Sequence, residues 1–166
     1  MLNFLQRAFT GVFSNAQPLE IGARAPTLTA TNQNGQPVNL GELYAKGYVL
    51  VYFYPKAFTP GCTAQACSLR DAFIDLSNLQ VTMLGVSHDS VESQKAFATA
   101  NQLPFALLAD PQSELYNAFG VSGLKRQSFL MKQGVVIWRA LSASTDRQAE
   151  DVKKALVEER AREASA

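Results

Sequence analysis

Residues 48–67 read YVLVYFYPKAFTPGCTAQAC, and this stretch decides which fold and which chemistry the chain can have. Its first seven residues are all aromatic or aliphatic, which is typical of a central strand buried on both faces of a sheet. Thr59, Pro60 and Gly61 then indicate a helix start, with Thr59 as the capping residue and Pro60 as the first helical residue. Both cysteines of the chain, Cys62 and Cys67, follow directly. The sequence therefore predicts two thiols at a strand-to-helix junction.

Cys62 is expected in the first turn of that helix, where free N–H groups and the positive end of the dipole favour a thiolate. Only about 3% of an ordinary thiol is ionised at pH 7. Arg126, from a later predicted strand, is a candidate for a second source of positive charge. The opposing interpretation is that both cysteines are small buried hydrophobic residues.

Cys67 lies five residues after Cys62. If one regular helix contains both, their Cα atoms are roughly 8–9 Å apart and on different faces of the helix. A disulfide needs less than about 7 Å. A bond between the two sulfurs would therefore require the first helical turns to unwind.

Composition excludes several other functions. The chain has 166 residues, 47% hydrophobic and 17% charged, which suits one globular domain. Its 15 Lys and Arg residues nearly balance 14 Asp and Glu residues, so we expect no nucleic-acid partner. A metal site would have to combine two cysteines, carboxylates and the single histidine, His88, so we expect no metal. His88 is interpreted as a solvated residue without a catalytic role.

Patterns elsewhere predict strands and helices in alternation. Ala66, Leu69, Phe73 and Leu76 have the spacing of one helix face, and Thr145 with Gln148 is typical of a capping box before a last helix. These elements predict an α/β fold with a central mixed sheet flanked by helices and an N-terminal β-hairpin. The remaining predicted features are hairpins at Asn34-Gly35 and Gln133-Gly134, strands over 81–86 and 105–109, and a helix start at Asp110-Pro111.

Residues 1–17 are predicted to lie outside a single domain formed by residues 18–166. Phe4, Phe9 and Phe13 are among apolar residues at helical spacing in this segment. We interpret it as a docking helix or a tail, and the alternative is a targeting or membrane-surface leader. A cytoplasmic location is expected under the first interpretation, and export or membrane association under the second.

The motif Pro55-x-x-x-Thr59-x-x-Cys62 resembles the active-site signature of peroxiredoxins. The longer run from Phe53 to Cys67 is similar to the bacterioferritin-comigratory-protein, or peroxiredoxin Q, subgroup. The resemblance covers about residues 18–160 and implies a thioredoxin-like fold. It extends to Gly85-Val86-Ser87, Leu103-Pro104-Phe105 and Arg126-Gln127-Ser128-Phe129.

The resemblance also implies a thiol-dependent peroxidase that reduces hydrogen peroxide and small organic hydroperoxides without a cofactor. Cys62 would attack the peroxide and become a sulfenic acid. Thr59 would hydrogen-bond the thiolate and the peroxide, Arg126 would activate both, and Pro55 would shield the site. Cys67 would resolve the sulfenic acid as an intramolecular disulfide. Thioredoxin or a similar dithiol protein would reduce that disulfide, and the enzyme would be a monomer.

Two alternatives stay open at this point. A protein thiol–disulfide oxidoreductase normally uses Cys-x-x-Cys, whereas four residues separate the cysteines here. A non-enzymatic binding module with the thioredoxin fold would not need Cys62 at all. Ala57 and His88 also differ from the residues that are usual at their positions in the subgroup.

Overall fold

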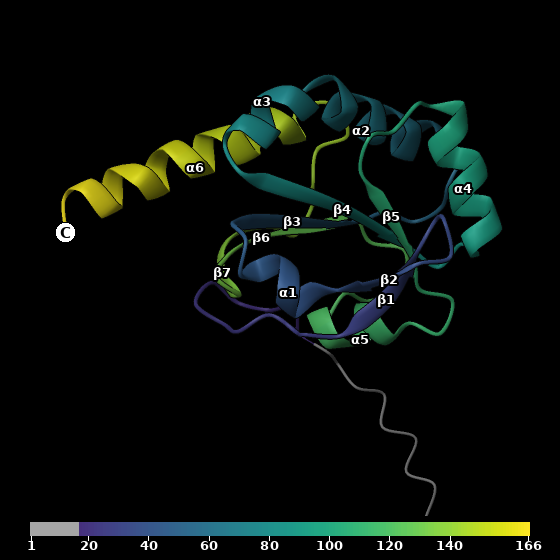
Figure 1. The fold of residues 1–166 in the computed structure, drawn as a ribbon, viewed down its shortest axis with the longest axis horizontal. Helices are drawn as coiled ribbons and strands as arrows, with labels where there is room; N and C mark the ends of the chain where they lie inside the picture. The colour runs from purple at the N-terminus through teal and green to yellow at the C-terminus, as the bar shows by residue number, and fades with distance from the viewer. Residues whose placement is uncertain (1–16) are drawn as a thin grey trace, which may run out of the picture.

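One seven-stranded mixed sheet organises the computed structural model, which describes residues 17–166 (Figure 1). The leader or docking helix predicted over residues 1–17 therefore falls outside the described residues, except for Gln17. The strand order is β2-β1-β5-β4-β3-β6-β7. The strands are β1 Thr29–Asn32, β2 Pro37–Asn39, β3 Tyr48–Phe53, β4 Val81–Ser87, β5 Ala106–Ala109, β6 Gln127–Lys132 and β7 Val135–Ala140.

Strand β3 is the predicted central strand. It runs parallel to β4 and antiparallel to β6, and all six of its residues are buried. Its side chains alternate between two cores because successive residues of a strand point to opposite faces. Leu50 and Tyr52 contribute to the core on one face of the sheet, whereas Val51 and Phe53 contribute to the core on the other face. The expected thioredoxin-like α/β architecture is confirmed.

Helices cover both faces of the sheet (Figure 1). Near the active site, α2 continues into α3 after a break at Ala72, where φ is −94° and ψ is 5°. The predicted stripe is therefore carried by two helices rather than one, although Leu69 and Leu76 are both buried as expected. The helices are α1 Leu40–Tyr44, α2 Pro60–Asp71, α3 Phe73–Asn78, α4 Val91–Ala100, α5 Glu114–Phe119 and α6 Gln148–Ala164.

Both predicted hairpins are confirmed. The β1–β2 pair is antiparallel around Asn34-Gly35, and Gly35 has the positive φ of 75° that a tight turn requires. The β6–β7 pair is antiparallel around Gln133-Gly134. These hairpins lie at the two ends of the sheet and leave β3 and β4 in its middle.

Two predicted helix starts are wrong. Helix α5 begins at Glu114 rather than at Asp110-Pro111, and the Asp110 carboxylate instead accepts a hydrogen bond from the Tyr116 N–H at 3.0 Å. Thr145 and Gln148 form no capping box, because α6 begins at Gln148 itself and its side chain is buried. Gln148 bonds to tertiary neighbours instead of the helix end, whereas Asp110 still accepts from an N–H in the first turn of α5.

Within residues 17–166, the helices are all too short or too polar to span a bilayer. The same residues contain no group of three or more His, Cys, Asp or Glu side chains that could hold a metal ion.

Candidate active site

The two cysteines lie on α2, directly after the loop that leaves β3. Cys62 is the third residue of the helix and only 1% exposed, whereas Cys67 is half-buried, and both are free thiols. Pro60 occupies the first helical position, as predicted. Because one continuous helix contains both cysteines, ideal geometry separates their Cα atoms by roughly 8–9 Å, beyond disulfide reach.

Thr59 occupies the capping position of α2, but its side chain does not cap the helix. Its hydroxyl donates to the carbonyl oxygen of Lys56 at 2.7 Å instead. A hydroxyl has one proton, so in this arrangement Thr59 can accept a hydrogen bond at the site but not donate a second one. The N–H groups of the first helical turn are left available to negative charge near Cys62.

Arg126 lies beside Cys62, as the sequence suggested. It directly precedes β6, and the antiparallel register pairs the neighbouring Gln127 with Phe53 at the end of β3. The Nη2 atom of Arg126 is 3.5 Å from the Cys62 sulfur. A guanidinium cation at this distance stabilises a thiolate relative to a thiol. The guanidinium also explains the glycine at position 61, because a Cβ atom added there would lie 2.9 Å from Nη2 of Arg126.

A chain of buried amides holds Arg126 in place. Its Nη1 donates to Gln65 Oε1 at 2.6 Å, Gln65 Nε2 donates to Gln148 Oε1, and Gln148 Nε2 donates to the Ser128 hydroxyl oxygen. Gln65, Gln148 and Ser128 are at most 1% exposed. Because arginine can only donate, the amide oxygen of Gln65 must face Arg126. The amide nitrogen of Gln65 then faces the oxygen of Gln148, and the nitrogen of Gln148 faces Ser128. This buried amide chain connects α2, α6 and β6 behind the thiol.

The sequence analysis missed Gln65 and gave Gln148 a different role. One signal was available, because each glutamine is four residues before a buried apolar residue of its own helix, Leu69 or Val152. An uncharged polar residue on the buried face of a helix needs a partner inside the protein. Which partner it finds depends on tertiary packing.

The active-site loop, residues 54–59, is held in place by the side chain of Asp89. One carboxylate oxygen of Asp89 accepts from the Ala57 N–H at 2.8 Å and from the Ser87 hydroxyl at 2.6 Å. The loop carries Pro55, which is half-buried, and it contains a left-handed residue, Phe58, with φ of 65°. Asp89 therefore fixes the middle of the loop at the point where its backbone is most unusual.

Two buried tyrosines hold the start of the same loop. The Tyr116 hydroxyl donates to the Tyr54 carbonyl oxygen at 3.0 Å, and the Tyr54 hydroxyl donates to Gln94 Oε1. Gln94 Nε2 continues to the Ser87 hydroxyl oxygen at 2.9 Å. Burial raises the pKa of both Tyr54 and Tyr116 well above the ordinary value near 10, so both remain neutral donors at physiological pH.

His88 is half-buried rather than freely solvated. Its ring stacks on Tyr116 with centroids 3.9 Å apart, and its Nε2 lies 3.0 Å from the Ser113 hydroxyl. His88 thus packs behind the active-site loop, with Tyr116 between it and Tyr54.

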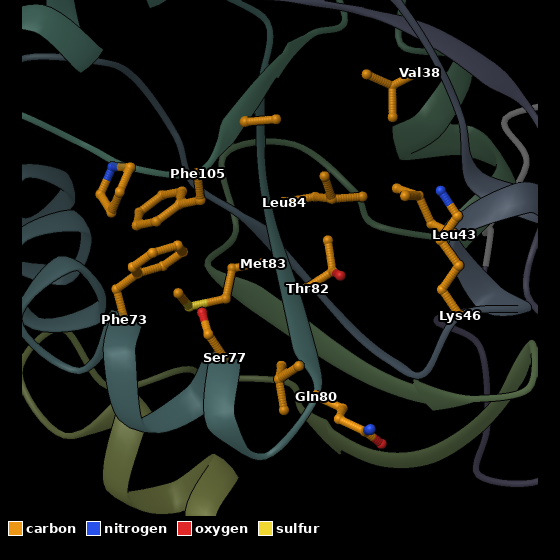
Figure 2. A pocket seen from close by; sticks show the side chains of 13 residues that line it. Val38, Leu43, Lys46, Phe73, Ser77, Gln80, Thr82, Met83, Leu84 and Phe105 are labelled. Carbon is orange, nitrogen blue, oxygen red and sulfur yellow. The ribbon is translucent and has the colours of Figure 1, made fainter.

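A groove of about 560 Å³ lies away from both cysteines, beside the first half of β4 (Figure 2). The groove exists because β5 pairs with β4 only from Leu84 onward. Residues Val81–Met83 of β4 therefore pair with β3 on one side and have no neighbouring strand on the side of β5. Phe73 and Phe105 line one side of it, and Leu43 and Lys46 line the other (Figure 2). None of the candidate active-site residues contributes to its lining.

Comparison with known proteins gives a consistent result. The profile of the AhpC/TSA family matches residues 21–139. Peroxiredoxin Bcp of Escherichia coli K12 is 45% identical over 115 residues, which cover 69% of this chain and 72% of that protein. Peroxiredoxin Bcp of Bacillus subtilis is 38% identical over 135 residues, which cover 73% and 85%.

Solved structures show the same likeness in three dimensions. Peroxidoxin BcpB of Mycobacterium tuberculosis superposes with a TM-score of 0.79 at 30% identity and covers 83% of this chain and 96% of its own. A mutant of peroxiredoxin Q from Xanthomonas campestris superposes with a TM-score of 0.78 at 28% identity and covers 85% and 97%. The likeness therefore extends over the fold of most of the chain.

Proposed function

The chain belongs to the AhpC/TSA family and is a thiol-dependent peroxidase of its Bcp and peroxiredoxin Q group, and from this premise we propose how its residues divide the reaction. Enzymes of this kind reduce a peroxide at the expense of a thiol. The observation that carries the assignment is the distance of 3.5 Å between Arg126 Nη2 and the sulfur of Cys62, because it puts a fixed cation beside a buried thiol.

In the first step, the Cys62 thiolate attacks one oxygen of the peroxide. A sulfur–oxygen bond forms, the oxygen–oxygen bond breaks, and the leaving hydroxide or alkoxide takes up a proton from solvent. Cys62 becomes a sulfenic acid. Arg126 stabilises the thiolate before the attack and the negative charge that develops on the leaving oxygen during it.

Thr59 and Pro55 shape the space in front of the sulfur. The Thr59 hydroxyl, which donates to Lys56, offers its lone pairs to the O–H group of the peroxide. If Thr59 instead donates to the thiolate, the hydrogen bond to Lys56 has to break. Pro55 lies in the loop that Asp89 and Tyr116 hold, and it limits access of water to the sulfenic acid.

In the second step, Cys67 attacks the Cys62 sulfur and forms an intramolecular disulfide. Both thiols lie in one regular helix, so residues 60–68 unwind before the sulfurs can meet. A dithiol protein such as thioredoxin then reduces the disulfide. We further propose that residues 18–166 form one catalytic domain, that the enzyme works as a monomer, and that it acts in the cytoplasm.

A steady-state assay tests this division of roles. The protein is supplied with hydrogen peroxide or an organic hydroperoxide and with thioredoxin kept reduced by its reductase. We expect turnover with wild-type protein, none with Cys62→Ser, and about one peroxide consumed per chain with Cys67→Ser. Normal cycling of Cys67→Ser with thioredoxin would remove its resolving role.

A parallel assay distinguishes the protein thiol–disulfide oxidoreductase. Reduction of insulin disulfides without peroxide would favour that activity. If Cys62→Ser retained the function of the protein, a non-enzymatic binding role would be favoured instead.

A further inference from the structure

The surroundings of Cys67 differ from those of an inert buried cysteine. Its sulfur lies 3.6 Å from Asn101 Oδ1, at the C-terminal end of α4. The Asn101 Nδ2 donates to the Phe97 carbonyl oxygen at 3.0 Å, which fixes the orientation of the amide. The oxygen of Asn101 must therefore face the sulfur, and it can only accept. In this contact the Cys67 S–H therefore donates to Asn101 Oδ1.

Arg70, which follows Cys67 by about one helical turn, also contacts Asn101. Its Nη1 donates to the Asn101 carbonyl oxygen at 2.9 Å. Residues three apart on a helix are neighbours on its surface, so the guanidinium lies beside the thiol. The hydrogen bond to Asp71 raises the pKa of Arg70, and the negative charge that Cys67 carries once it loses its proton raises it further, which agrees with that proximity.

We propose that Asn101 and Arg70 control the resolving step: Asn101 keeps the Cys67 thiol protonated and docked on α4, and Arg70 stabilises the thiolate that leaves this position to attack Cys62. A thiolate has no proton to donate, and it would be repelled by the partial negative charge of the side-chain oxygen Oδ1 of Asn101. Deprotonation therefore releases Cys67 from α4 at the moment when it becomes a nucleophile. This inference rests on the proposed function, because it needs the sulfenic acid of Cys62.

The chemistry of the step balances. The Cys67 thiolate attacks the sulfur of the sulfenic acid, the sulfur–sulfur bond forms, and the sulfur–oxygen bond breaks. The oxygen leaves as hydroxide and takes a proton from solvent to become water. Cys67 is oxidised and Cys62 is reduced.

Three groups near Cys67 come from three different elements. Cys67 interacts electrostatically with Arg70 on its own helix and with Tyr52 on β3, and α4 contributes the uncharged Asn101. Burial raises the pKa of Tyr52 well above its ordinary value, so it stays neutral in any test near pH 7. Asp71 pairs with Arg70 at 2.9 Å and weakens its effect.

The test is the rate of disulfide formation in a single turnover, measured from about pH 5 to about pH 9 by rapid alkylation and mass spectrometry. With Arg70→Gln, we expect a rate at pH 7 about threefold to tenfold lower and a pH profile displaced to higher pH. Arg70→Lys keeps the charge and should restore the profile. Asp71→Asn should displace the profile to lower pH, and Asn101→Ala should raise the rate at pH 7.

A purely structural role for Arg70 predicts another result. Loosening α2 alone would change the rate by the same factor at every pH, and parallel profiles for wild type and Arg70→Gln would overturn the inference. Failure of the proposed function is distinct from this result, because wild-type protein would then form no disulfide between Cys62 and Cys67 after peroxide treatment.

Discussion

The side chains of Gln65 on α2 and Gln148 on α6 hydrogen-bond to each other inside the protein, and neither reaches solvent. Gln65 also accepts from Arg126, and Gln148 also donates to Ser128. The position of the guanidinium beside Cys62 therefore depends on a residue of the last helix, which the sequence separates from Gln65 by 83 positions.

Gln148→Leu should impair both stability and peroxide reduction. The change keeps the volume of the side chain but leaves Gln65 Nε2 and the Ser128 hydroxyl without their partner, at a cost of about 1–3 kcal/mol in the free energy of unfolding. With Gln65 free to turn, Arg126 loses its fixed position and the peroxide step slows several-fold. Urea unfolding and stopped-flow oxidation measure the two effects. An unchanged peroxide rate in a destabilised variant would limit the buried amide chain to a structural role.

Arg126→Ala should slow the peroxide step by about 10²-fold to 10³-fold, because a fixed donor to the developing negative charge is lost. The thiolate absorbance of Cys62 near neutral pH should fall as well. Arg126→Lys is the matched control: it keeps a charge but cannot reach Gln65 and Cys62 through two nitrogens at once, so we expect an intermediate rate. The electrostatic role would be refuted by a thiolate titration that is the same in all three proteins.

Oxidation should unwind the beginning of α2. We expect one equivalent of peroxide to increase amide hydrogen exchange over residues 60–68, while Leu69 and the helix beyond it stay protected by burial. Cys67→Ser, which cannot form the disulfide, should keep the exchange pattern of the reduced protein. A disulfide between Cys62 and Cys67 within a fully protected helix would contradict the expectation.

Asp89→Ala should loosen the active-site loop. The substitution removes the acceptor of the Ala57 N–H and the Ser87 hydroxyl, and we expect a loss of about 1–3 kcal/mol in stability together with slower peroxide reduction. Asp89→Asn keeps one oxygen that accepts both hydrogen bonds, so it should behave nearly as wild type. If the asparagine variant were as slow as the alanine variant, the charge rather than the hydrogen bond would be the important property.

Alkaline pH should destabilise the fold through its buried tyrosines. Burial raises the pKa of Tyr44, Tyr52, Tyr54 and Tyr116 in the folded protein above the ordinary value near 10. The unfolded chain therefore releases these protons first, and the stabilisation is complete below pH 10 and lost as pH rises above it. Tyrosinate absorbance and circular dichroism should change together. Ionisation of these residues without loss of structure would contradict the prediction.

Local patterns in residues 48–67 predicted most of what builds the site. An uninterrupted apolar run predicts a buried strand wherever the chain goes next, and Thr59-Pro60 predicts a helix start from backbone chemistry alone. Cys62 at the start of a helix was accessible in this way, whereas Arg126 was only a candidate for a nearby cation. The resemblance to a known family added the order of reaction steps.

Contacts between distant elements could not be predicted. Gln148 matched a capping box, but burial against Ser128 and Gln65 decided its actual position. Asp110 matched a helix start, and its carboxylate does accept from the Tyr116 N–H in the first turn of α5, although that helix begins at Glu114 rather than at Pro111. At Gln148 a local preference worth about 1 kcal/mol gave way to the need to satisfy a buried polar group. Only the packed structure shows which polar groups are buried together.

The proposed unwinding of residues 60–68 lies wholly within α2, which ends at Asp71 before the interruption at Ala72. Beyond it, α3 is anchored by the buried Leu76 and by the ion pair between Asp75 and Lys153 at 2.8 Å. The proposed motion would therefore stay inside α2, and α3 would keep its packing on β4.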